Sequence, residues 1–302
     1  MVDTSTTGER RERQRSPRAP RHRSPRSVEN FTESFTRLGD LGYRGAQVSA
    51  SVLDLDSGRT LLAIDDRIAL PTASIGKILL LIEVSARLTG RDFAGYGILD
   101  KTPTDAVGDS GVWQHLQAPS LPVTDLATLV GSASDNLATN VLLRHIGLPA
   151  VRDRTEALGL QRTALLDLVR EDRGPDDAPQ LSVGSAAELT WLFAALARGE
   201  VVDPTTSSRV LGWLALGCDL SMVASAFGLD PLAHRFPDHG LQLVNKTGTD
   251  DGVRSEVGIL RGPRAAVVYA VTVVFDDEAL AGRLRVLDAL RAVGVDLLEY
   301  VH

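Results

Sequence analysis

Strand-like periodicity in this sequence occurs near the two ends of its main body, and helical periodicity fills the stretch between them. Five segments show the alternating apolar and polar positions of strands: residues 47–55, 60–64, 241–245, 256–261 and 265–275. The first two flank Asp56-Ser57-Gly58 and therefore predict a hairpin. Because strands pair to bury their apolar faces, we predict an antiparallel sheet built from both chain ends, with an all-helical lobe inserted between them.

Helical spacing of apolar residues covers most of the remaining body. The predicted helices are residues 28–40, a helix from residue 74 onward, and residues 124–130, 137–145, 149–158, 185–198, 204–216 and 278–300. The segment IGKILLLIEVSARL after Ser74 is apolar on every side, which predicts a helix buried in the middle of the molecule. With 302 residues, the chain fits one compound domain over residues 28–302, whose helical lobe covers roughly residues 76–217.

Residues 1–27 differ in composition from the rest, since they hold eight arginines, several Ser-Pro steps and almost nothing apolar. This composition predicts a disordered arm. Two alternatives stay open: upstream codons appended by a misassigned start, or a basic segment that contacts nucleic acid or another anionic surface. The arm lacks the apolar core of a secretory signal, and no later run has the length of a membrane span, so the sequence as written predicts a cytoplasmic protein without membrane contact.

Charge and cysteine content exclude several classes of function for the folded body. The chain has 39 acidic and 32 basic residues, and eight of the basic ones lie in the arm, so the body is no nucleic-acid binder. The single cysteine, Cys218, excludes an intramolecular disulfide and a thiolate cluster for a metal. The histidines at 115, 145, 234 and 239 show no ligand spacing. The sequence therefore offers no recognisable metal site. We also expect a monomer that acts on a small molecule.

Three short strings occur in the order Ser74-Ile75-Gly76-Lys77, Ser134-Asp135-Asn136 and Lys246-Thr247-Gly248. The whole chain contains only three lysines, at positions 77, 101 and 246, and two of them lie inside these strings. Burial and nearby cations lower the pKa of a lysine into the range of a general base, whereas a guanidinium keeps its proton in a protein. Most basic residues of this chain are arginines, but two of its three lysines lie in these strings, where an amine can act as a general base.

The first string predicts an activated nucleophile. With Ser74 in the first turn of the buried helix, Lys77 lies one turn further on the same face, where its amine is within reach of the serine hydroxyl. The helix N-terminus adds backbone N–H groups that stabilise an oxyanion. Two alternative interpretations are that Ser74 only caps the helix and that Lys77 is an ordinary surface lysine. Neither explains the two distant strings.

The other two strings predict a proton relay and a substrate site. Ser134 is a candidate to hand a proton to the leaving group, Asn136 to bind a substrate amide, and Asp135 to hold the loop, although Ser-Asp-Asn also reads as a helix cap. Lys246 offers a fixed positive charge for a substrate carboxylate, Thr247 a hydroxyl, and Thr249 a backbone N–H for the oxyanion. Arg254 is either a second cation for that carboxylate or the partner of Glu256 in a salt bridge.

At these residues the chain resembles the class A β-lactamase and penicillin-binding protein superfamily. The resemblance covers roughly Phe31 to the C-terminus and includes the 60-position interval from Ser74 to Ser134 and the stretch SLPVTDLATLVGSASDNLATNVLL. It implies an α/β fold with flanking helices and a helical lobe, a site in the cleft between the two parts, and acyl-enzyme chemistry on Ser74 without metal or organic cofactor.

The loop before Ser185 departs from that family. Efficient β-lactamases of the class carry a glutamate in an E-x-x-L-N context on an Ω-shaped loop, and this glutamate orients the water that cleaves the acyl-enzyme. Here the loop reads LLDLVREDRGPDDAPQL, in which Glu171 is the nearest acid and no L-N follows it. No base for deacylation is therefore assigned.

Three functions stay open at this point. The first is a serine hydrolase that opens a β-lactam or a related amide through an ester on Ser74, which is an antibiotic-resistance activity. The second is an intracellular esterase, amidase or transacylase that acts on a small metabolite. The third is a non-catalytic penicillin-binding sensor, although such a protein has no physical reason to keep nucleophile, base and relay together.

Overall fold

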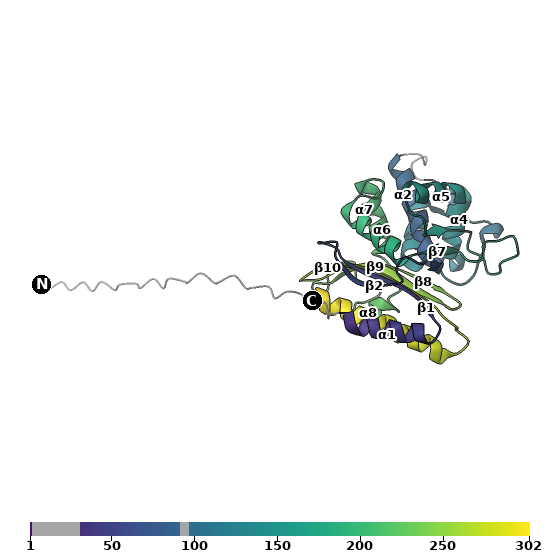
Figure 1. The fold of residues 1–302 in the computed structure, drawn as a ribbon. Coiled ribbons are helices and arrows are strands. Elements are labelled where there is room, and N and C mark those ends of the chain that lie inside the picture. The colour runs from purple at the N-terminus through teal and green to yellow at the C-terminus, as the bar shows by residue number, and fades with distance from the viewer. Residues whose placement is uncertain (2–30, 91–96) are drawn as a thin grey trace.

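The computed structural model describes Met1, residues 31–90 and residues 97–302. The predicted arm therefore lies outside the described residues except for Met1. A five-stranded antiparallel sheet in the order β2-β1-β10-β9-β8 forms the centre of the molecule (Figure 1). Its strands are β1 (Gln47–Asp54), β2 (Thr60–Ile64), β8 (Gln242–Asp250), β9 (Val253–Arg261) and β10 (Ala266–Val274). The predicted sheet from both chain ends is confirmed.

The order of the strands follows from their sequences. β10 reads AVVYAVTVV and pairs with β1 on one edge and β9 on the other. Its alternate residues lie in the two hydrophobic cores on opposite faces of the sheet, so the strand needs no polar alternation. β8 pairs only with β9 and forms an edge of the sheet. The predicted strand at residues 241–245 is too short, because β8 continues through Lys246-Thr247-Gly248 to Asp250.

Two helices from opposite ends of the chain cover one face of the sheet: α1 (Thr32–Tyr43) and α8 (Leu280–Val301) (Figure 1). Asp296 of α8 joins them, since its carboxylate accepts hydrogen bonds from Ser34 N at 2.9 Å and Ser34 Oγ at 2.6 Å. The apolar side of α8 packs with strand residues such as Val271 and Val273 in one hydrophobic core. This layer covers the face of the sheet away from the remaining α-helices.

The remaining helices gather on the opposite face (Figure 1). They are α2 (Lys77–Gly90), α3 (Val123–Ala133), α4 (Asn136–Ile146), α5 (Leu148–Ala157), α6 (Ala186–Arg198) and α7 (Pro204–Leu214). Short strands accompany them in two small sheets, formed by β3 (Leu70–Pro71), β6 (Ala164–Leu165) and β7 (Ser182–Gly184), and by β4 (Ile98–Asp100) and β5 (Ser120–Pro122). We propose that this group of helices is the lobe expected at residues 76–217, within a domain of residues 28–302.

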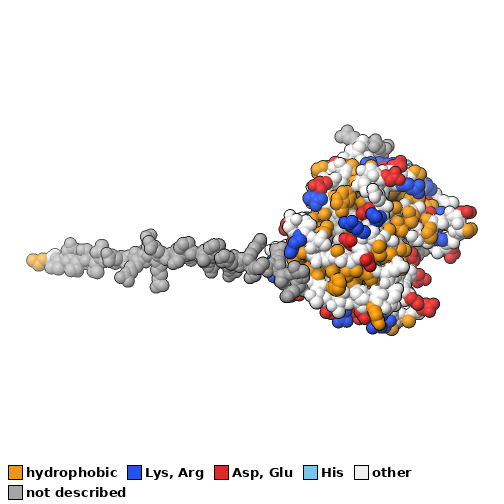
Figure 2. Space-filling view, in the orientation of Figure 1, with side chains coloured by type: hydrophobic (Ala, Val, Ile, Leu, Met, Phe, Trp, Pro, Cys, Tyr) orange, Lys and Arg blue, Asp and Glu red, His pale blue; other side chains and the backbone are white. Residues whose placement is uncertain are grey.

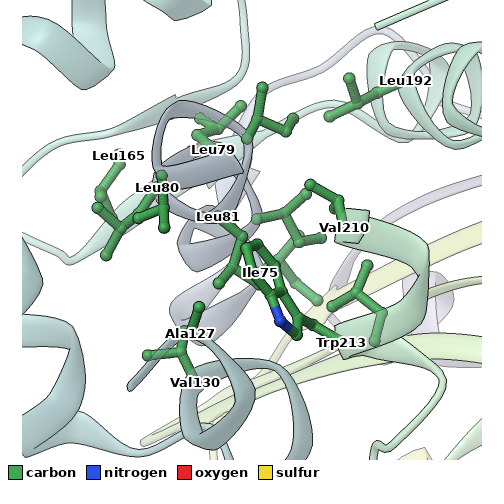
Figure 3. Packing of buried hydrophobic residues seen from close by; sticks show 14 of the residues in the cluster. Ile75, Leu79, Leu80, Leu81, Ala127, Val130, Leu165, Leu192, Val210 and Trp213 are labelled. Carbon is green, nitrogen blue, oxygen red and sulfur yellow. The ribbon is translucent and has the colours of Figure 1, made fainter. Parts of the chain in front are cut away.

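α2 lies at the centre of the lobe, as its apolar sequence predicts. Every residue from Lys77 to Ser85 is buried. Figure 3 shows Leu81 of α2, and Ile75 of the turn before it, near Trp213 and Val210 of α7. A helix enclosed on all sides fixes the position of its first residue, Lys77, and of the turn before it, which contains the rest of the first sequence string.

On the face shown in Figure 2, basic and acidic side chains are interspersed, and neither sign forms a continuous stripe. This face therefore lacks the extended basic surface that binds a nucleic-acid backbone. Among the helices of the described residues, none combines the length and the apolar character needed to cross a bilayer.

Candidate active site

Ser74 lies in a tight 3-10 turn, η2 (Ala73–Gly76), and α2 begins only at Lys77. The prediction that Ser74 sits in the first α-helical turn is thus wrong in detail, because Ala73 adopts a left-handed φ of 48° and tightens the chain there. Ser182 of β7 holds this turn: its Oγ donates to Ala73 O at 2.6 Å and accepts from Gly76 N at 3.3 Å. Sequence reasoning missed Ser182, which carries no local signal beyond a serine in a short strand.

The second string supplies the partners of the Lys77 ammonium. Lys77 Nζ donates to Ser134 O and Asn136 Oδ1, both at 2.6 Å, and to Ser134 Oγ at 3.3 Å. Among its described contacts there is no hydrogen bond to Ser74 Oγ. Ser134 stands between α3 and α4 with a left-handed φ of 55°, which turns its carbonyl and hydroxyl toward α2. The structure thus brings together the predicted base and the predicted relay.

Asp135 holds this turn in place, as expected. Its carboxylate accepts from Val112 N at 2.8 Å, from Trp113 N at 2.9 Å and, as the cap of α4, from Ala138 N at 2.9 Å. Asn136 already uses both ends of its amide, since its Oδ1 accepts from Lys77 and its Nδ2 donates to Gly108 O at 3.2 Å. The amide thus secures Lys77 and the loop at Gly108 in addition to the substrate contact predicted for it.

The third string reaches the same point from the sheet. Lys246 Nζ donates to Ser134 Oγ at 2.9 Å and to Thr247 O at 2.7 Å. The hydroxyl of Ser134 therefore lies between two amines that are 169 positions apart in the sequence. Lys77 and Lys246 are both buried, at 0% and 3% exposure.

Burial changes the ionisation of both lysines. Desolvation holds the pKa of Lys77 well below its usual range, and the nearby Lys246 charge lowers it further, while Asp135 and Asp109 act in the opposite direction. Desolvation lowers the pKa of Lys246 to about 8, against a smaller opposing effect of Asp219. At neutral pH, Lys246 is thus mainly charged, and Lys77 is more readily deprotonated than an ordinary lysine.

Gly248 allows the edge strand to touch the Ser74 turn. A Cβ at this position would lie 2.2 Å from Thr72 O and 3.2 Å from Ser74 N. Both neighbours are backbone atoms, so neither can yield by a side-chain rotation. The glycine in the third string is therefore required by the close approach of two backbones.

Ser74, Ser134, Lys246, Thr247 and Thr249 line one cavity of about 440 Å³ between the sheet and the helices. A neighbouring cavity of about 590 Å³ shares Ser74 and Thr249 and is also lined by Asn136. All three strings therefore face connected space. The geometry can activate a serine hydroxyl, hold an anionic substrate group beside Lys246 and pass protons through Ser134.

Comparison with known proteins agrees with this arrangement. The model of the beta-lactamase enzyme family matches residues 30–301. The chain belongs to this family. A beta-lactamase of Streptomyces albus G is 27% identical over 263 residues, which cover 84% of this chain and 81% of that protein. The enzyme is accordingly a beta-lactamase-type serine hydrolase.

Solved structures share the fold of this family member. A beta-lactamase from Sphaerobacter thermophilus DSM 20745 superposes with a TM-score of 0.74 at 24% identity and covers 87% of this chain and 95% of its own. The structure of PBP-A has a TM-score of 0.72 at 18% identity, with coverage of 89% and 96%. The α/β fold with flanking helices implied by the resemblance is thereby confirmed.

Glu171, the acid nearest to the family's glutamate in sequence, is bound elsewhere in this enzyme. Its Oε1 accepts from Gly108 N at 2.6 Å. Glu171 and Val169 both line the second cavity. Asn140 fixes this part of the loop, because its Oδ1 accepts from Val169 N and its Nδ2 donates to Val169 O, each at 2.9 Å. In the described residues, no carboxylate hydrogen-bonds to Ser74 or Lys77.

Arg254 pairs with Asp277 and not with Glu256. Its guanidinium lies 3.4 Å from Asp277 Oδ2 and donates to Asp250 O and Val253 O, each at 2.8 Å. The predicted salt bridge to Glu256 is wrong, because Asp277 follows β10 and covers the start of β9, whereas Glu256 is enclosed by other partners. Arg254 is also absent from the residues that line either cavity.

Proposed function

We propose that this enzyme opens β-lactams through an acyl-enzyme on Ser74. The observation that carries the proposal is the position of Ser134 Oγ, 3.3 Å from Lys77 Nζ and 2.9 Å from Lys246 Nζ, in the cavity that Ser74 lines. A hydroxyl between two amines of lowered pKa fits a proton relay better than a structural role.

In the proposed acylation, neutral Lys77 removes the proton of Ser74 as Oγ attacks the lactam carbonyl. The backbone N–H groups of Ser74 and Thr249 stabilise the oxyanion. As the C–N bond breaks, Ser134 gives its proton to the leaving nitrogen and takes one from the ammonium of Lys77. Lys246, Thr247 and Asn136 bind the substrate carboxylate and amide.

Release of the acyl group requires a base that orients a water at the ester on Ser74. Glu171 is engaged with Gly108, and among the described residues no carboxylate hydrogen-bonds to Ser74 or Lys77. We therefore propose slow deacylation, which is nearer to penicillin binding or acyl transfer than to rapid hydrolysis. PBP-A, a structural relative, has been solved as an acyl-enzyme complex with penicillin G in an L158E mutant, with a TM-score of 0.71.

The test is mass spectrometry of the protein, intact and after proteolytic digestion, following mixing with a fluorescent penicillin or with a chromogenic ester. We expect a penicillin adduct on the peptide that contains Ser74, formed faster than it is lost. Rapid turnover of the lactam would favour an efficient β-lactamase, and turnover of the ester alone would favour the metabolite esterase. A protein that binds the penicillin reversibly and forms no adduct would be the sensor.

The pKa of Lys246 predicts how penicillin binding depends on pH. Below pH 8 the ammonium is charged and attracts the substrate carboxylate, and above pH 8 it loses its proton. We expect the apparent affinity for the penicillin to fall by about tenfold for each pH unit above 8. Acylation kinetics measured from about pH 6 to about pH 10, on both sides of the Lys246 pKa, give the half-saturating penicillin concentration at each pH. An ester without a carboxylate should lack the decline, and an unchanged affinity for penicillin above pH 8 would contradict the assignment.

The close backbone approach at Gly248 leads to a second expectation. In Gly248→Ala, the new methyl group must push β8 away from the turn that holds Ser74. We expect acylation to slow about 100-fold, since small misplacements of reacting groups have effects of this size. The matched control is Gly212→Ala, where a Cβ meets nothing within 4 Å. Equal acylation rates in the two variants would show that the approach is unimportant.

A further inference from the structure

A polar cluster that the proposed chemistry does not use is buried on the face of β8 and β9 opposite Lys246. Glu256 and Tyr269 are fully buried, and Asn245 is 1% exposed. Glu256 Oε1 accepts from Tyr269 OH at 2.7 Å and from Asn245 Nδ2 at 2.9 Å. Since successive residues of a strand point to opposite faces, the Asn245 side chain leaves β8 on the side opposite Lys246. Asn245 also lines the edge of the cavity that contains Lys246.

Glu256 is an unusual residue to bury at this place. Desolvation raises the pKa of Glu256 to about 7, although its hydrogen bonds to Tyr269, Asn245 and Ala224 act against the rise. The Asp219 carboxylate raises the pKa further, and in the described part of the chain no lysine or arginine pairs with Glu256. A buried carboxyl without a cation is costly, so a packing role alone does not account for it.

The amide of Asn245 links this cluster to the cleft. Its Nδ2 also donates to Asp219 O at 3.2 Å, while its Oδ1 is buried without a partner in the described residues. Asn245 thus acts only as a donor and gives its two N–H groups to Glu256 and to the backbone of Asp219. A side chain that only accepts hydrogen bonds could not bond to the Asp219 carbonyl or to the Glu256 carboxylate.

Residues 217–219 form the loop that receives this bond, and all three line the cavity with Ser74 and Lys246. On the helical side, Cys218 N donates to Ser132 O at 2.9 Å, two residues before Ser134. The loop therefore spans the two parts of the molecule beside the contact between Lys246 and Ser134.

We propose that Asn245 and Glu256 are positioning residues that fix the 217–219 loop and thereby set the cleft edge where Lys246 meets Ser134. Glu256 orients the Asn245 amide from behind the sheet, and the amide holds the backbone of Asp219. The consequence for catalysis rests on the proposed function, because it concerns how a substrate carboxylate is held beside Lys246.

Cys218 gives a readout of the loop that does not depend on activity. It is exposed and is the only cysteine in the chain, so a small aromatic disulfide reagent modifies one site. We compare the rate at which the reagent modifies the Cys218 thiol, at one fixed pH, in wild type, Asn245→Ala and Gln242→Ala. Gln242 is the matched control, since it is an amide on the same strand. The same proteins are then titrated with a fluorescent penicillin to separate half-saturation from the limiting acylation rate.

In Asn245→Ala we expect the thiol to react several-fold faster and the half-saturating penicillin concentration to rise by roughly tenfold or more, with a much smaller change in the limiting rate. Glu256→Met removes the carboxylate that accepts from the Asn245 amide, so we expect the thiol rate to rise in the same direction as in Asn245→Ala. An unchanged thiol rate in Glu256→Met would remove Glu256 from the proposal. Should Asn245→Ala lose cooperative melting, Asn245→Ser takes its place, since one short hydroxyl cannot reach both acceptors.

Equal thiol rates in Asn245→Ala and Gln242→Ala would overturn the proposal. A faster thiol with unchanged half-saturation would overturn its catalytic part, since the loop would then move without affecting the substrate. Absence of any penicillin adduct in wild type would refute the proposed function instead, and the thiol rates would still decide whether the pair fixes the loop.

Discussion

Replacing Ser74 with alanine is expected to abolish the covalent penicillin adduct and to reduce any turnover by about 10⁶-fold. Removal of a serine nucleophile costs on this order in enzymes whose catalytic groups act as a unit. The Ser134 hydroxyl does not take its place, because it is held by Lys77 and Lys246. Intact-protein mass spectrometry and a chromogenic β-lactam measure the two quantities.

The control for this variant is Ser110→Ala. Ser110 lines both cavities, as Ser74 does, so the change removes a hydroxyl from the same space without touching the turn before α2. We expect Ser110→Ala to keep its adduct. An adduct that persists in Ser74→Ala would show that Ser74 is not the nucleophile. The roles assigned to the other residues relative to Ser74 would then be wrong as well.

Replacing Lys77 with arginine is expected to slow acylation by about 10³- to 10⁴-fold. The guanidinium still donates hydrogen bonds to Ser134 and Asn136, but it cannot accept the proton of Ser74. Burial favours a neutral amine at this position, and an arginine would keep a permanent charge there. Rapid-mixing kinetics with the fluorescent penicillin give the rate, and thermal melting establishes that the variant is folded.

Lys101→Arg is the matched exchange, since Lys101 is the one lysine outside the three strings and donates only to backbone carbonyls of Trp113 and Leu116 in the described contacts. It should acylate as wild type does. Lys77→Met removes the amine without adding a charge and serves if the arginine variant does not fold. Near-normal acylation in Lys77→Met would assign proton removal to another group.

Local sequence patterns predicted most of the elements of this fold. Alternation over residues 47–64 gave the β1–β2 hairpin, and the uniformly apolar segment after Ser74 gave the buried helix α2. The boundaries were less accurate where tertiary contacts extend an element, as in β8, which continues through the third string because β9 pairs with it to Asp250. The short strands β3 to β7 had no periodic signal, since two or three residues are too few for one.

Within the site, residue type and spacing alone pointed to the serines and lysines of the three strings, because only certain side chains can supply a nucleophile or a base. The contacts of these and neighbouring residues depend on the tertiary structure. Lys77 bonds to Ser134 rather than Ser74, Arg254 pairs with Asp277, Glu171 turns to Gly108, and Asn245 bridges Asp219 and Glu256. Each of these contacts joins segments that are far apart or on different elements, and their distances are set by how sheet and helices pack, which no local pattern encodes.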